Sequence, residues 1–158
     1  MVKQNPKFTS VQIQQGFTLI ELLVVIGIFG ILASLSLFMS LDFFRTYSTN
    51  SEEVTLVSAL SKARSQSLAN INGNPHGVRV TTTQYIIFEG TSYATRVTSL
   101  DQTLSVNSSE HPSAQTDIVF DQLSGSTSTT CSSNCTISMT GSGVSKTITV
   151  NAQGAILW

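Results

Sequence analysis

The chain has 158 residues, enough for one domain of modest size but not for two. Only 11% of its residues are charged, well below the roughly 25% of a typical soluble domain, and the formal net charge is −1. Basic residues of the later part of the chain are scattered rather than gathered into the patch that a nucleic-acid-binding domain needs, and they include Lys62, Arg64, Arg79, Arg96 and Lys146.

The N-terminal region predicts a helix that crosses a membrane. Residues 1–16 are polar, with Lys3 and Lys7 as their only charges, and residues 17–41 contain one charge, Glu21, and no proline. As a helix the apolar run measures about 37 Å, more than the roughly 30 Å of a bilayer core. Because both lysines precede the run, the positive-inside rule predicts a cytoplasmic N-terminus and an external C-terminal part.

Two simpler interpretations of this run compete. A secretory signal peptide has an apolar region of about 7–15 residues followed by a small-residue cleavage site. The run here is longer, and no Ala-x-Ala-like site follows it. A plain membrane anchor leaves Glu21 unexplained, because a carboxylate within an apolar helix costs about 3 kcal/mol and is a functional candidate by default.

Residues 16–22 read Gly-Phe-Thr-Leu-Ile-Glu-Leu and open the apolar run. This segment resembles the cleavage site of type IV prepilins and pseudopilins. The resemblance implies that a prepilin peptidase cuts between Gly16 and Phe17 and that the new amine of Phe17 is methylated. It also implies that Glu21 pairs with the terminal amine of a neighbouring subunit and sets the register of a filament. The partners would be this peptidase, other pilin or pseudopilin subunits, an inner-membrane assembly platform and membrane lipid.

Small residues within the run suggest close helix packing. Gly30 and Ser34 form a small-x-x-x-small pair, and Gly27 lies one turn earlier. The alternative is that these residues reflect the ordinary composition of a membrane helix. Many members of the family carry a helix-kinking proline in this stretch, and residues 17–41 have none.

Residues 42–73 are expected to continue the helix with an amphipathic pattern. A weaker stretch at 48–51 could form a bend, and Gly73 followed by Pro75 predicts the helix end. The apolar face is expected to carry Val57, Leu60, Leu68 and Ile71, with Ala63 and Ser67 between them. The polar positions are expected at Glu52, Glu53, Lys62 and Arg64.

Residues 74–158 have the pattern of a β-rich head. β-Branched and aromatic runs predict strands, with turns at 141–143 and 151–154, over 77–80, 85–88, 93–97, 117–120, 136–139, 147–150 and 155–158. A long helix followed by such strands indicates an α+β fold, in which the helix packs on an antiparallel sheet. We therefore expect four segments: a leader at 1–16, a membrane and assembly helix at 17–41, its continuation at 42–73 and the head at 74–158.

The head also resembles a subgroup of this family. Residues 59–64, 77–80, 85–88 and 148–156 are similar to the corresponding parts of H-type minor pseudopilins (the GspH/FimT group). Some members of that group bind DNA through a basic C-terminal segment, but no Lys or Arg follows Val150 here. Removal of Lys3 and Lys7 with the leader would also change the formal charge from −1 to −3. Nucleic acid is therefore not an expected partner.

Cys131 and Cys135 are a candidate disulfide in an oxidising compartment. The small loop that it would close corresponds to about 2 kcal/mol, and two unpaired thiols are the alternative. His76 and His111 stand beside prolines in expected loops, as surface or hydrogen-bonded residues. Asp117 and Asp121 make at most a weak calcium pair, and Trp158 could cap the core or contact a partner.

No catalytic constellation is recognisable, so neither an enzyme nor a cofactor or metal is predicted. The sequence favours a minor pseudopilin or prepilin-type structural subunit of a type II secretion or type IV pilus filament. A DNA-binding minor pilin for DNA uptake and a major pilin are the alternatives. The expected location is the inner membrane, with a cytoplasmic N-terminus and the head outside the cytoplasm.

Overall fold

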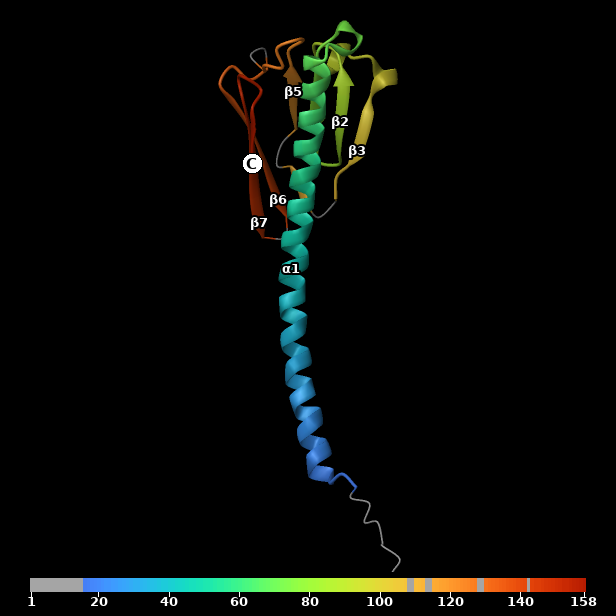
Figure 1. The fold of residues 1–158 in the computed structure, drawn as a ribbon, viewed down its shortest axis with the longest axis vertical. Coiled ribbons are helices and arrows are strands. Elements are labelled where there is room, and N and C mark those ends of the chain that lie inside the picture. The colour runs from blue at the N-terminus through green and yellow to red at the C-terminus, as the bar shows by residue number, and fades with distance from the viewer. Residues whose placement is uncertain (1–15, 108–109, 113–114, 128–129, 142) are drawn as a thin grey trace, which may run out of the picture. The chain divides into compact units, whose positions relative to one another are not determined.

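The computed structural model describes residues 16–107, 110–112, 115–127, 130–141 and 143–158, apart from the side chains of 36–42, 44, 45, 110 and 111. The chain divides into two compact units, Met1–Ser40 and Leu41–Trp158. From here on, the head means this second unit, so it includes the C-terminal part of α1 as well as residues 74–158. Each unit is described by itself. Helix α1 (Leu19–Leu68) contributes residues to both (Figure 1).

α1 continues through residues 48–51, where the sequence suggested a bend. The hydroxyl of Thr55 donates to the Ser51 carbonyl at 2.9 Å, so this polar stretch is satisfied within the helix. α1 ends at Leu68, and a short 3-10 helix η1 (Ile71–Gly73) follows. The predicted stop is therefore confirmed but comes earlier than Gly73, because Asn70 already adopts a left-handed conformation with φ of 53°.

The described residues of the head form two antiparallel sheets of four strands each. The first, sheet A, has the order β3-β2-β1-β5 and consists of β1 (His76–Val80), β2 (Gln84–Glu89), β3 (Gln102–Ser105) and β5 (Thr116–Phe120). The second, sheet B, has the order β4-β6-β7-β8 and consists of β4 (Glu110–Pro112), β6 (Asn134–Gly141), β7 (Val144–Asn151) and β8 (Ile156–Leu157).

Both predicted turns of the C-terminal region are confirmed. Gly141 pairs with Val144 across the β6–β7 hairpin, and Gly143 has a φ of 86° that suits glycine. The turn that follows β7 is closed by a hydrogen bond of 2.8 Å from the Gly154 N–H to the Asn151 carbonyl.

One buried apolar cluster joins α1 to both sheets. In the view of Figure 1, α1 lies in front of the strands of the head, with β6 and β7 to its left and β2 and β3 to its right. The cluster includes Leu56, Leu60 and Ala63 from α1, Val78, Val80, Ile118 and Phe120 from sheet A, and Ile137, Met139, Ile148 and Val150 from sheet B. The expected α+β fold, with a helix packed on antiparallel β-structure, is therefore confirmed.

The strand predicted at 93–97 is wrong. This segment forms a 3-10 helix, η2 (Tyr93–Thr95), whose first turn is capped by Ser92 Oγ accepting from the Thr95 N–H at 3.3 Å. The Tyr93 ring packs edge-on against Phe88, with 5.5 Å between the ring centroids. Packing on the outside of sheet A and a local cap therefore outweigh the β-type composition. A second 3-10 helix, η3 (Thr98–Leu100), precedes β3.

The polar and apolar positions predicted for α1 need correction. Glu52 and Glu53, expected on the surface, are only 7% and 6% exposed. Leu68 and Ile71, expected in the core, are 44% and 43% exposed. Two sheets cover a wider arc of the helix than one sheet would, so adjacent residues can both be buried.

The two buried glutamates face different sheets. Glu53 accepts a hydrogen bond from Lys146 of β7 at 3.0 Å. Glu52 accepts from the Asn107 N–H at 3.4 Å, and it lies near Tyr85 of β2. Burial raises the pKa of Tyr85, and the Glu52 carboxylate raises this pKa further. Both carboxylates therefore help to orient α1 in the head.

Candidate functional site

The start of α1 is fixed by a side-chain cap. Thr18 precedes the first helical residue, and its hydroxyl accepts a hydrogen bond of 3.3 Å from the Glu21 N–H. The Leu22 N–H donates to the Thr18 carbonyl at 3.2 Å. Thr18 is thus the N-cap, and Thr-x-x-Glu has the spacing of a capping box. Sequence reasoning missed this role of Thr18, although the spacing itself could have indicated it.

The capped start places the predicted site residues close together. Gly16 and Phe17 are exposed and immediately precede the cap, with Phe17 86% exposed. Glu21 is also exposed and lies in the first turn of α1. A carboxylate at this place interacts favourably with the helix dipole, by about 0.3–1 kcal/mol. The residues expected to be cleaved, methylated and paired therefore lie within one segment of six residues, from Gly16 to Glu21.

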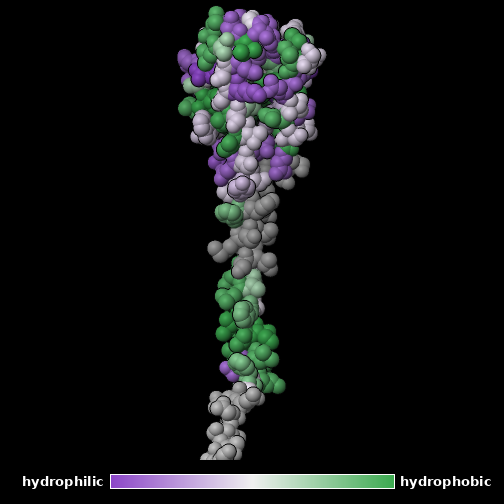
Figure 2. All heavy atoms as spheres, turned by 45° about the vertical axis from the view of Figure 1, so that its right-hand side comes forward, coloured by the Kyte–Doolittle hydropathy of each residue, from purple (hydrophilic) through white to green (hydrophobic). Residues whose placement is uncertain are grey.

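The first part of α1 exposes apolar side chains on all sides. Every described side chain from residue 16 to 35 is exposed, and the large apolar ones range from 42% at Val25 to 86% at Phe17. Figure 2 shows hydrophobic side chains covering this stretch, whereas the head surface in view mixes both kinds. A helix that is apolar all round is normally covered by other helices or by lipid.

In the part of the chain that the structure describes, no helix combines the length and the apolar character needed to cross a membrane. The membrane helix predicted at 17–41 includes the side chains of 36–41, which lie outside the described residues.

The small residues of this helix make no close contact with another described part of the chain. A methyl group added at Gly27 or Gly30 would meet no described atom within 4 Å. The Ser34 hydroxyl donates to the Ile31 carbonyl at 2.7 Å, so it is satisfied within the helix. A contact of these three residues with another helix stays a prediction.

The described basic side chains of the head serve its own structure. Arg79 pairs with Asp117 at 3.2 Å, and Arg96 pairs with Asp101 at 2.8 Å. Both guanidinium groups also lie over the Tyr93 ring, at 4.0 Å and 3.7 Å from its centroid. The other contacts are Lys146 with Glu53, Lys62 with Gln102 Oε1, and Arg64 with the carbonyls of Gly125 and Gln153. These contacts do not favour DNA binding.

The histidines and aspartates do not form a metal site in the described region. Both histidines were expected in loops, and both lie in strands. His76 begins β1 and is buried, and His111 lies in β4. Asp117 is held by Arg79, and Asp121 accepts a hydrogen bond from Ser126. Among the described residues, no group of three or more His, Cys, Asp or Glu could hold a metal ion.

The two cysteines lie together at the edge of the head's core. Cys131 and Cys135 form a disulfide in the structure, with 5.5 Å between their Cα atoms. Cys131 is buried in the apolar cluster, and Cys135 packs against that cluster while partly exposed. Trp158 does not cap the core, because it is 67% exposed.

Comparison with known protein families identifies a motif at the N-terminal end of the chain. Residues 12–37 match the family model of the prokaryotic N-terminal methylation motif, a type IV pilin-like motif. No curated protein and no solved structure matches the chain. The matched segment contains the predicted cleavage residues, the capped helix start, Glu21 and the three small residues. It supports a type IV pilin-like or pseudopilin-like subunit that assembles with other pilin subunits, and a structural rather than an enzymatic role.

Proposed function

We propose that this chain is a minor pseudopilin or prepilin-type structural subunit of a type II secretion or type IV pilus filament. A prepilin peptidase removes residues 1–16 by cutting between Gly16 and Phe17, and the new amine of Phe17 is methylated. Residues 17–41 cross the inner membrane from a cytoplasmic N-terminus, and the head lies outside the cytoplasm. The observation that carries this proposal is the methylation motif at residues 12–37.

The charges at the helix start suggest how subunits associate. Cleavage would leave an ammonium group on Phe17, next to the positive end of the helix dipole, which is an unfavourable place for a cation. Glu21 supplies the opposite charge in the first turn of α1. In an apolar bundle of helices neither charge is stable without a partner. Pairing of Phe17 with Glu21 of a neighbour would satisfy both, and only one axial stagger of the helices permits it.

The apolar surface of the same segment supports this mode of assembly. The large apolar side chains described between Phe17 and Leu35 are exposed in the single chain. Lipid would cover them before assembly and neighbouring helices afterwards. The open surface at Gly27, Gly30 and Ser34 would let a neighbouring helix approach closely. The assembly platform of the inner membrane would add each subunit to the filament.

Replacement of Glu21 tests this assembly mechanism. Glu21→Gln keeps the size of the side chain but removes its charge, so a neighbour's amine would stay buried without a counter-ion, at about 3–5 kcal/mol. We expect the fraction of subunit recovered in sheared filaments to fall more than tenfold, at equal amounts of cleaved protein. Glu21→Asp, which keeps the charge, should retain more incorporation than Glu21→Gln. Wild-type incorporation of Glu21→Gln would contradict the pairing.

A further inference from the structure

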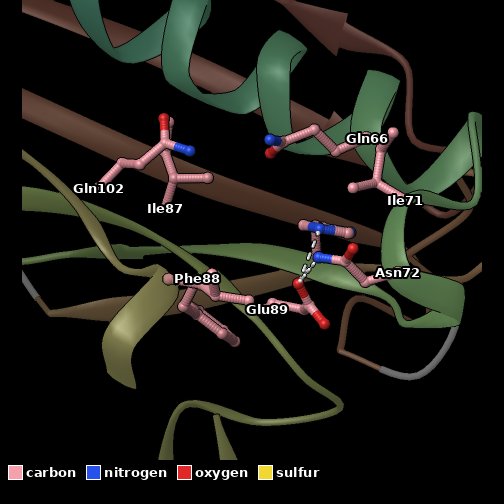
Figure 3. Close-up of a pocket in the computed structure, with 9 residues that line it drawn as sticks. Gln66, Ile71, Asn72, Ile87, Phe88, Glu89 and Gln102 are labelled. Carbon is pink, nitrogen blue, oxygen red and sulfur yellow. Dashed lines mark hydrogen bonds and ion pairs between the residues drawn. The ribbon is translucent and has the colours of Figure 1, made fainter. Parts of the chain in front are cut away.

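The head contains a pocket of about 190 Å³ beside the end of α1. It lies between the helix end and strands β1, β2 and β3 of sheet A, and the side chains of Gln66 and Gln102 face each other across it (Figure 3). The volume is slightly larger than the roughly 150 Å³ cavity that accepts benzene in an engineered protein. The pocket therefore has room for a small organic group but not for a large ligand.

The wall of the pocket combines an apolar surface with a few polar groups. Its apolar residues are Ile71, Ile87, Phe88 and Leu100, and its polar residues are Gln66, Asn72, His76, Glu89 and Gln102. Ile71 and Leu100 are also partly open to solvent, so they lie toward the mouth. Apolar walls with a few converging polar groups are typical of small-molecule sites.

Glu89 brings a buried negative charge to this pocket. Its side chain is almost inaccessible, and its two carboxylate oxygens accept hydrogen bonds of 2.7 Å from the amides of Asn72 and Asn74. The hydrogen bond from Asn72 lowers the pKa of Glu89, and the Asn74 amide lowers it further. Glu89 is therefore ionised at neutral pH.

His76 does not balance this charge at neutral pH. Its Nε2 lies 3.7 Å from Glu89 Oε2, beyond hydrogen-bond distance. Burial lowers the pKa of His76, so the neutral imidazole predominates, although Glu89 partly opposes this shift. Its Nδ1 is buried and has no hydrogen-bond partner among the described residues. The two amides hold the Glu89 carboxylate as an anion, no cation among the described residues pairs with it at neutral pH, and the pocket leaves space beside it for one.

We propose that this pocket binds a small organic cation, a primary ammonium or a guanidinium group on a short apolar stem. The charged group lies against Glu89, and the stem packs on Ile71, Ile87 and Leu100. Two sources share this chemistry: a free amine, and a lysine or arginine side chain of a neighbouring subunit. The inference goes beyond the proposed function, because it concerns the head and does not need cleavage at Gly16.

The test uses the full chain in detergent micelles at pH 7.5 and constant ionic strength. n-Butylammonium chloride is titrated while the NMR signals of His76 and of the Glu89 amide are followed, with 1-butanol as the neutral probe of similar size. We expect saturable shifts with the cation that are at least tenfold weaker with the alcohol. No shift with the ammonium probe, or equal effects of both probes, would overturn the proposal.

Two variants and one control separate the contribution of the Glu89 charge to binding from that of the open volume of the pocket. Glu89→Gln should weaken n-butylammonium binding at least tenfold, and Leu100→Trp, which fills the mouth but keeps Glu89, should also abolish it. Asp117→Asn removes a carboxylate that pairs with Arg79 outside the pocket, and it should bind within twofold of wild type. Unchanged binding by Leu100→Trp would place the probe elsewhere and refute the site, even if Glu89→Gln does not fold.

Filament assembly in the presence of n-butylammonium distinguishes the two sources. If a neighbour's side chain fills the pocket, the probe and Glu89→Gln should reduce incorporation to a similar extent. If the ligand is a free amine, incorporation should stay unchanged in both cases while binding persists. Because cleavage at Gly16 is measured separately, a failure of the proposed function cannot be mistaken for a failure of this site.

Discussion

Ser67 links the end of α1 to three other parts of the head. Its hydroxyl donates to the Phe120 carbonyl at 2.9 Å and accepts from the His76 N–H at 2.8 Å. Its own carbonyl accepts from the Leu123 N–H at 2.9 Å. The side chain is fully buried, so water cannot replace these bonds. The helical pattern predicted a small residue here but not these partners, because β1 and β5 reach it only in the folded head.

Ser67→Ala tests the importance of this connection. The substitution leaves the His76 N–H and the Phe120 carbonyl without their side-chain partner, and each unsatisfied buried group costs about 1–3 kcal/mol. We expect the free energy of unfolding to fall by about 2 kcal/mol in urea titrations. Ser65 is exposed on the same helix, so Ser65→Ala should change stability by less than about 0.5 kcal/mol. Equal effects of the two variants would contradict this role.

At the scale of elements, two loops meet where only glycine fits. Gly154 has a φ of 75°, and a Cβ added to it would collide with the Gly125 carbonyl oxygen. Arg64 of α1 donates to that same oxygen at 3.4 Å and to the Gln153 carbonyl at 3.5 Å. The turn after β7 and the loop after β5 are therefore fixed to each other and to the helix.

Gly154→Ala is expected to destabilise the head more than Gly143→Ala. Both glycines have positive φ, which costs alanine about 1–2 kcal/mol, but Gly143 faces open space. The collision at Gly154 should add about 1–3 kcal/mol to that strain. Urea unfolding of the two variants measures the difference. Equal stabilities would show that the two loops separate without significant cost.

The disulfide contributes through a very short loop. Because Cys131 and Cys135 are four residues apart, the chain-entropy model gives about 2 kcal/mol of stability. Addition of a reductant should therefore lower the free energy of unfolding by about this amount. The Cys131→Ser, Cys135→Ser double variant should start lower and show no response to the reductant. If the wild-type protein does not respond either, the loop is not constrained by this bond.

Most strands were predictable from a local pattern, β8 at the predicted 155–158 among them, but β3 and β4 were not. β1, β2, β5, β6 and β7 contain β-branched and aromatic runs with buried positions. β3 is exposed at every position and β4 has three residues, so neither shows a periodic apolar signal. At 93–97 the sequence has a β-type pattern but the structure has no strand. The position of Tyr93 is set by contacts with Phe88, Arg79 and Arg96, and not by the residues next to it in the sequence.

At the scale of the whole molecule, the two candidate sites differ in how far sequence reveals them. The residues from Gly16 to Glu21 are contiguous, so their motif and their capped helix start can be identified from one short segment. The pocket beside Glu89 is built from α1, η1, η3 and three strands. The net charge of the pocket depends on His76, because burial of this side chain favours the neutral imidazole beside Glu89. No local pattern in the sequence indicated that His76 is buried.

The central claim is that the chain is made with a leader and processed between Gly16 and Phe17. We would measure the intact mass and the N-terminal sequence of the full chain, produced with an active and with an inactive prepilin peptidase. The account predicts a mature chain that begins at Phe17, with or without one added methyl group, only when the peptidase is active. A chain that retains residues 1–16 in the presence of the active peptidase would contradict it.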